Sequence, residues 1–202
     1  MITIGVTGII GSGKTTVSTM LRRKGLKVVD LDGLAKKAIT RKEVQEEIID
    51  RIGKEYVKDG TVAVEKLRDK VFDEKGALSE LENIIHPKVI EGLNRELARL
   101  KKQGIRVVVV DAPLLFEKGL NKEVDRTVVV SAETEKIRQR LKARGLTQED
   151  MTRRMSHQIP LKQKEEKADF IVFNNGSRED LETRVDELLR RIKEWEVSIN
   201  AS

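Results

Sequence analysis

The chain has 202 residues, of which 40 are Lys or Arg and 34 are Asp or Glu, giving a formal net charge of +6. This length suits one well-buried core, and the absence of cysteine excludes disulfides and cysteine-based metal sites. No apolar run approaches the roughly 20 residues that cross a bilayer, so we expect a cytoplasmic protein with no membrane partner.

Short β-branched runs alternate with longer stretches of helical periodicity, which is typical of βαβ units around a parallel sheet. Helices are predicted from a glycine-rich loop to about Lys24 and from about Arg178 to Trp195. We therefore expect a three-layer α/β fold with a five-stranded parallel sheet, built from about residues 1–34, 100–135 and 168–196. The predicted strands are Ile2–Thr7, Lys27–Leu31, Ile105–Asp111, Arg126–Val130 and Phe170–Phe173.

Two insertions interrupt this alternation. Residues 35–99 contain no convincing strand, and His86-Pro87 is predicted to divide them into separate helices, because proline disfavours helical geometry at the preceding residue. Residues 136–167 contain ten Lys or Arg against four Asp or Glu, an excess equal to the net charge of the whole chain. Only 3% of all residues are aromatic, which argues against stacking on single strands, so we expect a polyphosphate ligand and no nucleic acid.

The strongest motif follows the first predicted strand. Gly8-Ile9-Ile10-Gly11-Ser12-Gly13-Lys14-Thr15 matches G-x-x-x-x-G-K-[ST], with a strand before it and an amphipathic helix after it. Such a loop surrounds phosphates with backbone N–H groups and the positive end of the helix dipole. Lys14 is expected to reach the β- and γ-phosphates and the Thr15 hydroxyl to bind Mg²⁺. The predicted ATP-binding residues of the loop are Gly8, Gly11, Ser12, Gly13, Lys14, Thr15 and Thr16.

A second signal, Asp30-Leu31-Asp32, stands at the end of the second strand. Ligands of open α/β sheets gather beyond the carboxyl ends of the strands, so at least one of these aspartates is expected to face the γ-phosphate. A carboxylate there can orient a hydroxyl and accept its proton, and Asp32 is favoured for this role. The alternative is a pair of carboxylates that cap the following loop.

Asp111 follows the most apolar strand. It is placed to hold Mg²⁺ through water, although a helix N-cap is an alternative role. In the basic insertion, Arg140, Arg144, Arg153 and Arg154 have forked donors that suit phosphate oxygens. Each of them alone could instead belong to a solvated helix face.

These motifs, in this order, resemble the dephospho-CoA kinase family over nearly the whole chain. The resemblance is carried by the P-loop and by Val29-Asp30-Leu31-Asp32, Asp59-Gly60, Val71-Phe72, His86-Pro87, Pro113-Leu114-Leu115-Phe116-Glu117, Arg154 with Gln158, and Ala168-Asp169 with Asn174. The resemblance implies transfer of the γ-phosphate of ATP to the ribose 3′-hydroxyl of dephospho-coenzyme A, the last step of coenzyme A synthesis.

The resemblance also implies roles for the insertions and for individual residues. Residues 35–99 become a helical substrate-binding insertion that includes His86, and residues 136–167 become a lid over ATP. Asp32 is then the catalytic base, with Lys14 and Arg140 acting on the phosphates. Arg154 and Asn174 become ATP contacts, and Pro113 and Leu114 become substrate contacts. The cofactor implied is Mg²⁺, and we expect a monomer whose partners are ATP and dephospho-coenzyme A. Ile9, Val64 and Ile137 depart from the family's usual glycine, arginine and glutamine.

Two alternatives share the P-loop. A regulatory GTPase is disfavoured because Asp30-Leu31-Asp32-Gly33 follows Lys14 too closely to leave room for a first switch. In addition, Asn121-Lys122-Glu123-Val124-Asp125 misses N-K-x-D by one residue. Another nucleotide or nucleoside kinase is a closer rival, and His86-Pro87 with Pro113–Glu117 argues against it.

Overall fold

The computed structural model describes residues 1–64, 66–67 and 75–200. The chain divides into two compact units, a larger one of residues 1–29 and 101–202 and a smaller one of residues 30–100. Val71-Phe72 of the family pattern lies outside the described residues. None of the helices that the structure describes is both long enough and apolar enough to cross a bilayer.

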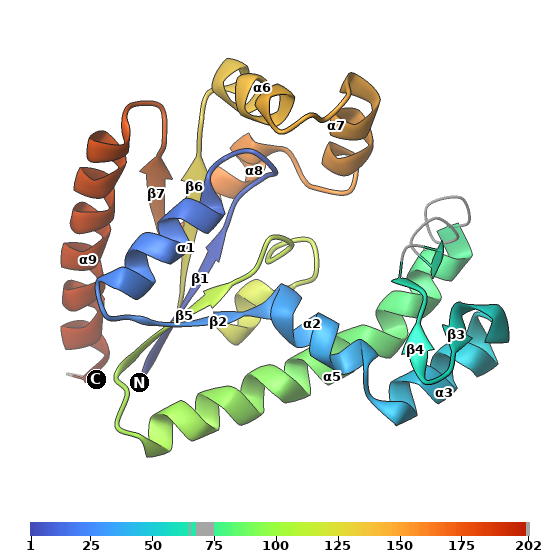
Figure 1. The fold of residues 1–202 in the computed structure, drawn as a ribbon. Helices are drawn as coiled ribbons and strands as arrows, with labels where there is room; N and C mark the ends of the chain where they lie inside the picture. The colour runs from blue at the N-terminus through green and yellow to red at the C-terminus, as the bar shows by residue number, and fades with distance from the viewer. Residues whose placement is uncertain (65, 68–74, 201–202) are drawn as a thin grey trace. The chain divides into compact units, whose positions relative to one another are not determined.

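A five-stranded sheet in the order β2-β5-β1-β6-β7 carries the fold (Figure 1). β1 pairs in parallel with both β5 and β6, and β6 pairs in parallel with β7. The α/β fold and the sheet are confirmed, and each strand agrees with its prediction to within two residues at either end. The strands are β1 (Ile2–Thr7), β2 (Lys27–Asp30), β5 (Val107–Asp111), β6 (Arg126–Ser131) and β7 (Phe170–Phe173).

Alternate residues of β1 show how the two faces of the sheet are covered. Ile2, Ile4 and Val6 are buried in the main hydrophobic cluster, together with residues of α1 (Lys14–Arg23) and α9 (Arg178–Asn200). On the other face, a Cβ atom placed at Gly5 would lie 2.8 Å from the Leu115 side chain. Glycine at this position therefore lets the segment after β5 pack closely on the central strand.

The basic insertion forms α6 (Thr134–Ala143), α7 (Gln148–Met155) and α8 (Leu161–Glu165), shown in yellow to orange in Figure 1. Ahead of it lies the short 3₁₀ helix η2 (Leu120–Glu123). A small hydrophobic cluster joins the insertion to the phosphate loop. Its buried members are Ile9, Ala132, Ile137, Leu141 and Met151.

The smaller unit contains α2 (Leu31–Ile39), α3 (Lys42–Arg51), the 3₁₀ helix η1 (Lys54–Tyr56) and most of α5 (Lys75–Lys102). It also contains an antiparallel hairpin of β3 (Val57–Lys58) and β4 (Thr61–Val62), so the prediction of no strand here was wrong. The turn residues Asp59 and Gly60 have φ of 50° and 69°. Positive φ at both residues of a two-residue Asp-Gly loop is typical of hairpins, so the sequence did contain the signal.

The prediction that Pro87 separates two helices was also wrong, because α5 runs through it as one 28-residue helix. Proline removes one backbone donor, but its ring is exposed and Ile84 and Val89 on either side are buried. Ile84 belongs to a cluster with Val44 and Ile48 of α3. Packing before and after Pro87 therefore outweighs the lost hydrogen bond.

Candidate active site

The phosphate loop is already shaped for an anion. Gly11 and Gly13 have φ of 83° and 99°, in the left-handed region that glycine adopts without steric cost. α1 begins directly at Lys14, and no side chain caps its N-terminus. The first N–H groups of a helix lack intrahelical partners, so they are available to phosphate oxygens. Thr15 and Thr16, in the first turn, are exposed.

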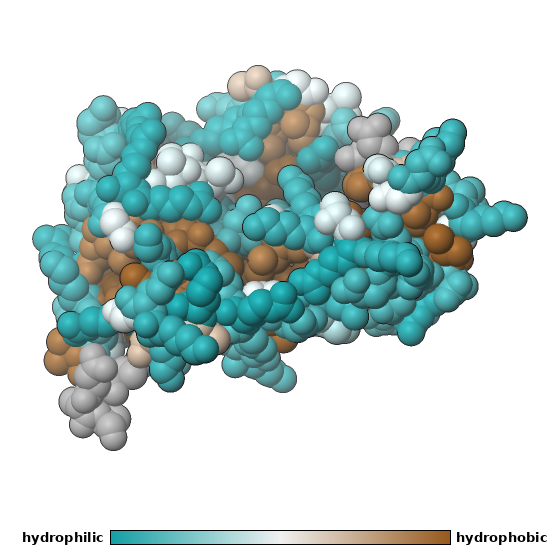
Figure 2. All heavy atoms as spheres, turned by 60° about the horizontal axis from the view of Figure 1, so that its bottom comes forward, coloured by the Kyte–Doolittle hydropathy of each residue, from teal (hydrophilic) through white to brown (hydrophobic). Residues whose placement is uncertain are grey.

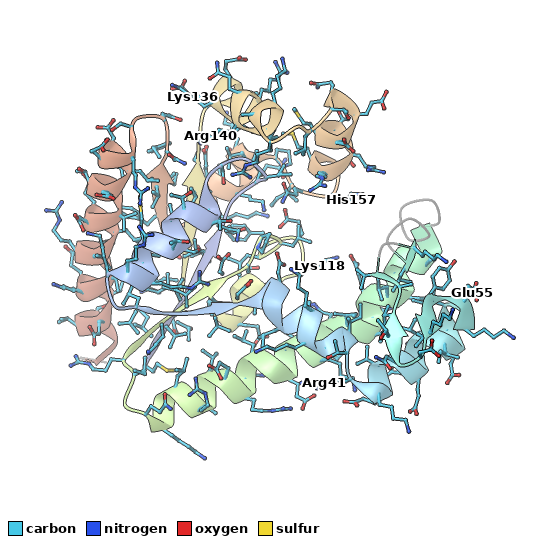
Figure 3. All side chains as sticks on the ribbon, in the orientation of Figure 1. Arg41, Glu55, Lys118, Lys136, Arg140 and His157 are labelled. Carbon is cyan, nitrogen blue, oxygen red and sulfur yellow. The ribbon has the colours of Figure 1, made fainter. Side chains whose placement is uncertain are left out.

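The carbonyl groups of the loop are held from outside by two predicted ATP contacts. Asn174, buried after β7, donates its Nδ2 to the Ser12 carbonyl at 2.8 Å. Arg140 of α6 lies 3.4 Å from the carbonyl oxygens of Gly11 and Ser12 and donates to the Asn174 carbonyl at 2.8 Å. Figure 3 shows Arg140 on the side of α6 that faces this loop, whereas Lys136 points outward. With the carbonyls so engaged, the inward face of the loop presents N–H groups.

Gly13 is required by this arrangement. A Cβ atom at Gly13 would lie 2.0 Å from Asn174 Nδ2, closer than any side chain permits. Ser12 is fully buried, and its hydroxyl has no hydrogen-bond partner among the described residues. A contact of Ser12 with phosphate would therefore come from its backbone.

Lys14 forms an ion pair with Asp111, the last residue of β5. Asp111 pairs in register with Val6, so parallel pairing of β5 with β1 brings the carboxylate beside the phosphate loop. Both side chains are mostly buried. The chain continues from Asp111 through turns, so the helix N-cap considered for this residue is wrong.

The other predicted site residues lie in several places. Asp30 is the N-cap of α2 and accepts a hydrogen bond from the Asp32 backbone at 3.1 Å, which matches the capping alternative. Asp32 is exposed in the first turn of α2, which begins at Leu31, directly after β2. His86 is half-buried in α5, and Arg154 is exposed on α7. Pro113 and Leu114 are half-buried in the turns after β5.

The family model for dephospho-CoA kinase matches residues 2–180. The chain belongs to the dephospho-CoA kinase family. A dephospho-CoA kinase of Fusobacterium nucleatum is 38% identical over 94% of this chain and 97% of its own. A dephospho-CoA kinase of Corynebacterium glutamicum is 36% identical over 95% of this chain and 98% of its own. The predicted family is thereby confirmed, and the P-loop GTPase is disfavoured.

Solved structures agree with this membership. A protein of Thermus thermophilus superposes with a TM-score of 0.82 at 38% identity, over 94% of this chain and 97% of its own. The dephospho-CoA kinase of Campylobacter jejuni gives a TM-score of 0.71 at 25% identity, over 94% and 96%. A shikimate kinase of Acinetobacter baumannii gives 0.53 at 15% identity, over 96% and 94%, and that likeness concerns the fold alone.

In this member of the dephospho-CoA kinase family, sequence reasoning missed Lys164 of α8. Its side chain is fully buried, donates to the Pro113 carbonyl at 3.0 Å and pairs with Glu117 at 2.8 Å. Burial lowers the pKa of the Lys164 ammonium, the Lys14 charge acts in the same direction, and the bond to Glu117 opposes both. The sequence shows Lys164 only as one of ten basic residues in the insertion.

A shallow depression also lies along α1, from its first turn to its last residue. It is lined by Thr15, Thr16, Thr19, Met20, Arg23 and Arg178. Arg23 and Arg178 were not predicted to belong to the site. Arg23, the last residue of α1, and Arg178, the first residue of α9, add positive charge to this depression.

Proposed function

We propose that this chain transfers the γ-phosphate of ATP to the ribose 3′-hydroxyl of dephospho-coenzyme A, giving coenzyme A and ADP. Membership of the family supports the reaction. The observation that carries the proposal is the phosphate loop, with its carbonyls held by Arg140 and Asn174 and with Lys14 at the uncapped start of α1. This arrangement presents backbone N–H donors to a triphosphate before it arrives, as electrostatic preorganisation requires, and Asp111 holds Lys14 beside them.

The phosphate-side roles follow from chemistry. Backbone N–H groups of residues 8–16 bind the β- and γ-phosphates, and Lys14 offsets charge on the group in transfer. Arg140 and Asn174 keep the loop in shape through its carbonyl groups, and both are proposed to contact ATP. Arg154 completes the ATP contacts when α7, within the lid of residues 136–167, closes. ATP is bound in this way without rearrangement of the loop.

The acceptor-side roles are assigned to Asp32, His86, Pro113 and Leu114. The Asp32 carboxylate accepts the proton of the 3′-hydroxyl as its oxygen bonds to the γ-phosphorus and ADP leaves. His86, Pro113 and Leu114 contact dephospho-coenzyme A. The enzyme acts as a monomer in the cytoplasm.

Thr15 and Asp111 are the residues proposed to hold Mg²⁺. They supply a hydroxyl and a carboxylate, which are oxygen ligands of the kind that Mg²⁺ prefers. No group of three or more acidic or imidazole ligands occurs among the described residues. That donor set fits an ion held by one or two protein ligands and by substrate phosphates. When bound, the ion neutralises charge on the β- and γ-phosphates.

A coupled assay of ADP release tests the activity. The purified chain is given ATP with dephospho-coenzyme A, adenosine or nucleoside monophosphates in turn, and GTP replaces ATP in a parallel series. We expect turnover with ATP and dephospho-coenzyme A only. Lys14→Met should remain folded by circular dichroism and lose about 10²-fold or more in kcat. Turnover of a nucleoside monophosphate in preference to dephospho-coenzyme A would contradict the assignment.

A further inference from the structure

Lys164 is the largest fully buried side chain among the described residues. Lysine is almost never fully buried unless it is paired, because removing an ammonium from water is costly. Here the Nζ atom lies 2.8 Å from Glu117 Oε1 and 3.0 Å from the Pro113 carbonyl oxygen. A buried charge at this position therefore joins α8 to the turns after β5.

The Pro113 carbonyl receives a second donor from β1. Thr7 Oγ1 donates to it at 3.0 Å, so both lone pairs of this oxygen are used. Thr7 directly precedes Gly8, the first residue of the phosphate loop, and Pro113 lies two residues after Asp111. The Pro113 carbonyl thus connects three parts of the structure: the start of the phosphate loop at Thr7, the segment that follows Asp111, and α8. We call these connected hydrogen bonds the Pro113 joint.

Glu117 connects the Pro113 joint to the residues just before α8. The same Oε1 atom accepts a hydrogen bond from the Ile159 backbone at 2.9 Å, ahead of α8. The adjacent Gln158 accepts one from the Ile10 backbone in the phosphate loop at 3.0 Å. The segment from Gln158 to Lys164 is therefore attached at three points around Lys14 and Asp111.

An apolar side chain of similar volume would fill the Lys164 position without the cost of burying a charge. The Lys14 charge is also close enough to lower the pKa of Lys164, which adds to that cost. Stability alone therefore does not account for an ammonium here.

We propose that Lys164 is a positioning residue for phosphoryl transfer, which holds the Pro113 carbonyl and thereby sets the place of Asp111 relative to Lys14 and the rest of the phosphate loop. The proposal rests on the proposed kinase activity. Reacting groups misplaced by about 1 Å can cost about 100-fold in rate, so loss of this joint is expected to act on kcat.

The test separates positioning from stability with two variants. Lys164→Met alone leaves the Glu117 carboxylate buried without its cation, so the thermal midpoint should fall. Lys164→Met with Glu117→Gln removes both charges and keeps an acceptor for Ile159, so most of the thermal midpoint should return. We expect kcat of this double variant to stay about 10- to 100-fold low, with both KM values within about threefold of the unmodified chain. A double variant with a restored midpoint and normal kcat would overturn the proposal.

Two controls complete the experiment. Lys162→Met changes an exposed lysine of the same helix and should leave kcat unchanged. Thr7→Val removes the other donor to the Pro113 carbonyl and should lower kcat, as the Lys164 variants do. If the Lys164 variants do not fold, a normal kcat in Thr7→Val overturns the proposal by itself. Activity of the unmodified chain on dephospho-coenzyme A is measured first, so that failure of the proposed function is recognised separately.

Discussion

Asp30 and Asp32 differ in role although they stand two residues apart. Asp30 accepts the backbone hydrogen bond that begins α2, so its carboxylate serves the helix. Asp32 lies in the first turn of α2 and is exposed to solvent. The capping function and the proposed base function are therefore divided between the two residues.

Asparagine at each position should separate these roles. In Asp32→Asn the proton acceptor is lost while size is kept, so kcat should fall about 10²- to 10⁴-fold with little change in the dissociation constants of ATP and dephospho-coenzyme A. Asp30→Asn should keep most of kcat, because asparagine is also a good N-cap. The measurement is kcat with both dissociation constants for the two variants side by side. A greater loss of kcat in Asp30→Asn would show that the wrong aspartate has been named.

Among the elements, α9 has a well-defined start. Ser177 and Asp180 exchange hydrogen bonds, with Ser177 N donating to Asp180 Oδ2 at 2.8 Å and Asp180 N donating to Ser177 Oγ at 3.1 Å. This capping box satisfies two donors at the N-terminus of the helix that covers one face of the sheet. The hydrogen bonds from Ser177 lower the pKa of Asp180 below its usual value of 3.8.

The pH dependence of unfolding should report this cap. A carboxyl group with a lowered pKa stabilises the fold above its unfolded pKa, and that contribution disappears as the pH falls through the folded pKa. Asp180→Asn should therefore lower the thermal midpoint at pH 7, and the difference from the unmodified chain should shrink as the pH falls below about 3.8. Glu182→Gln, with the same charge change beyond the first turn, should show a smaller difference. A difference that is constant from pH 7 to pH 2 would contradict this account.

The accuracy of prediction differed between kinds of element. The strands and the phosphate loop could be predicted because buried β-branched runs and glycine spacing are local signals. Pro87 misled because its effect depends on packing around α5, and the hairpin at Asp59-Gly60 was overlooked although its signal was local. The pairing of Lys164 with Glu117 could not be predicted, because it joins residues 47 apart and nothing marks one buried lysine among nine other basic residues.

At the scale of the whole molecule, charge is divided between the two units. Residues 30–100 contain 14 Lys or Arg against 16 Asp or Glu, so the larger unit carries all of the positive excess. Hydrophilic side chains cover most of the face drawn in Figure 2, with smaller apolar areas between them. The larger unit, which contains the phosphate loop, thus also carries the net positive charge that attracts phosphate.

The basic insertion should move in part and not as a whole. α8 is attached through Lys164 and through a hydrogen bond from Ser131 to Glu165, and α6 is attached to the phosphate loop through Arg140. α7 follows Gly145, which has a φ of 78°. Most of its residues are exposed. We expect amide hydrogen exchange in residues 148–155 to slow when a non-hydrolysable ATP analogue binds, while residues 161–165 change little. Equal protection of α7 with and without the analogue would contradict a lid.

Two of the three residues that depart from the family's pattern, Ile9 and Ile137, pack in the same hydrophobic cluster. Ile9 of the phosphate loop and Ile137 of α6 are both buried in the same hydrophobic cluster. A glycine and a glutamine there would leave that cluster smaller and more polar. Val64, the third departure, is exposed, and nothing in the described structure explains it.

The position of β1 in the sheet has a consequence for how the protein is made. Its neighbours β5 and β6 are translated about 100 residues later, which at about 5–20 residues per second is roughly 5–20 s. During that interval the apolar strand Ile2–Thr7 has left the ribosome without a partner, while residues 30–100 can already form their own contacts. The phosphate loop lacks its hydrogen bond from Asn174 for longer still, because residue 174 is made near the end of the 202-residue chain. We therefore expect folding during synthesis to begin with the smaller unit, while β1 stays unpaired until β5 and β6 have been made.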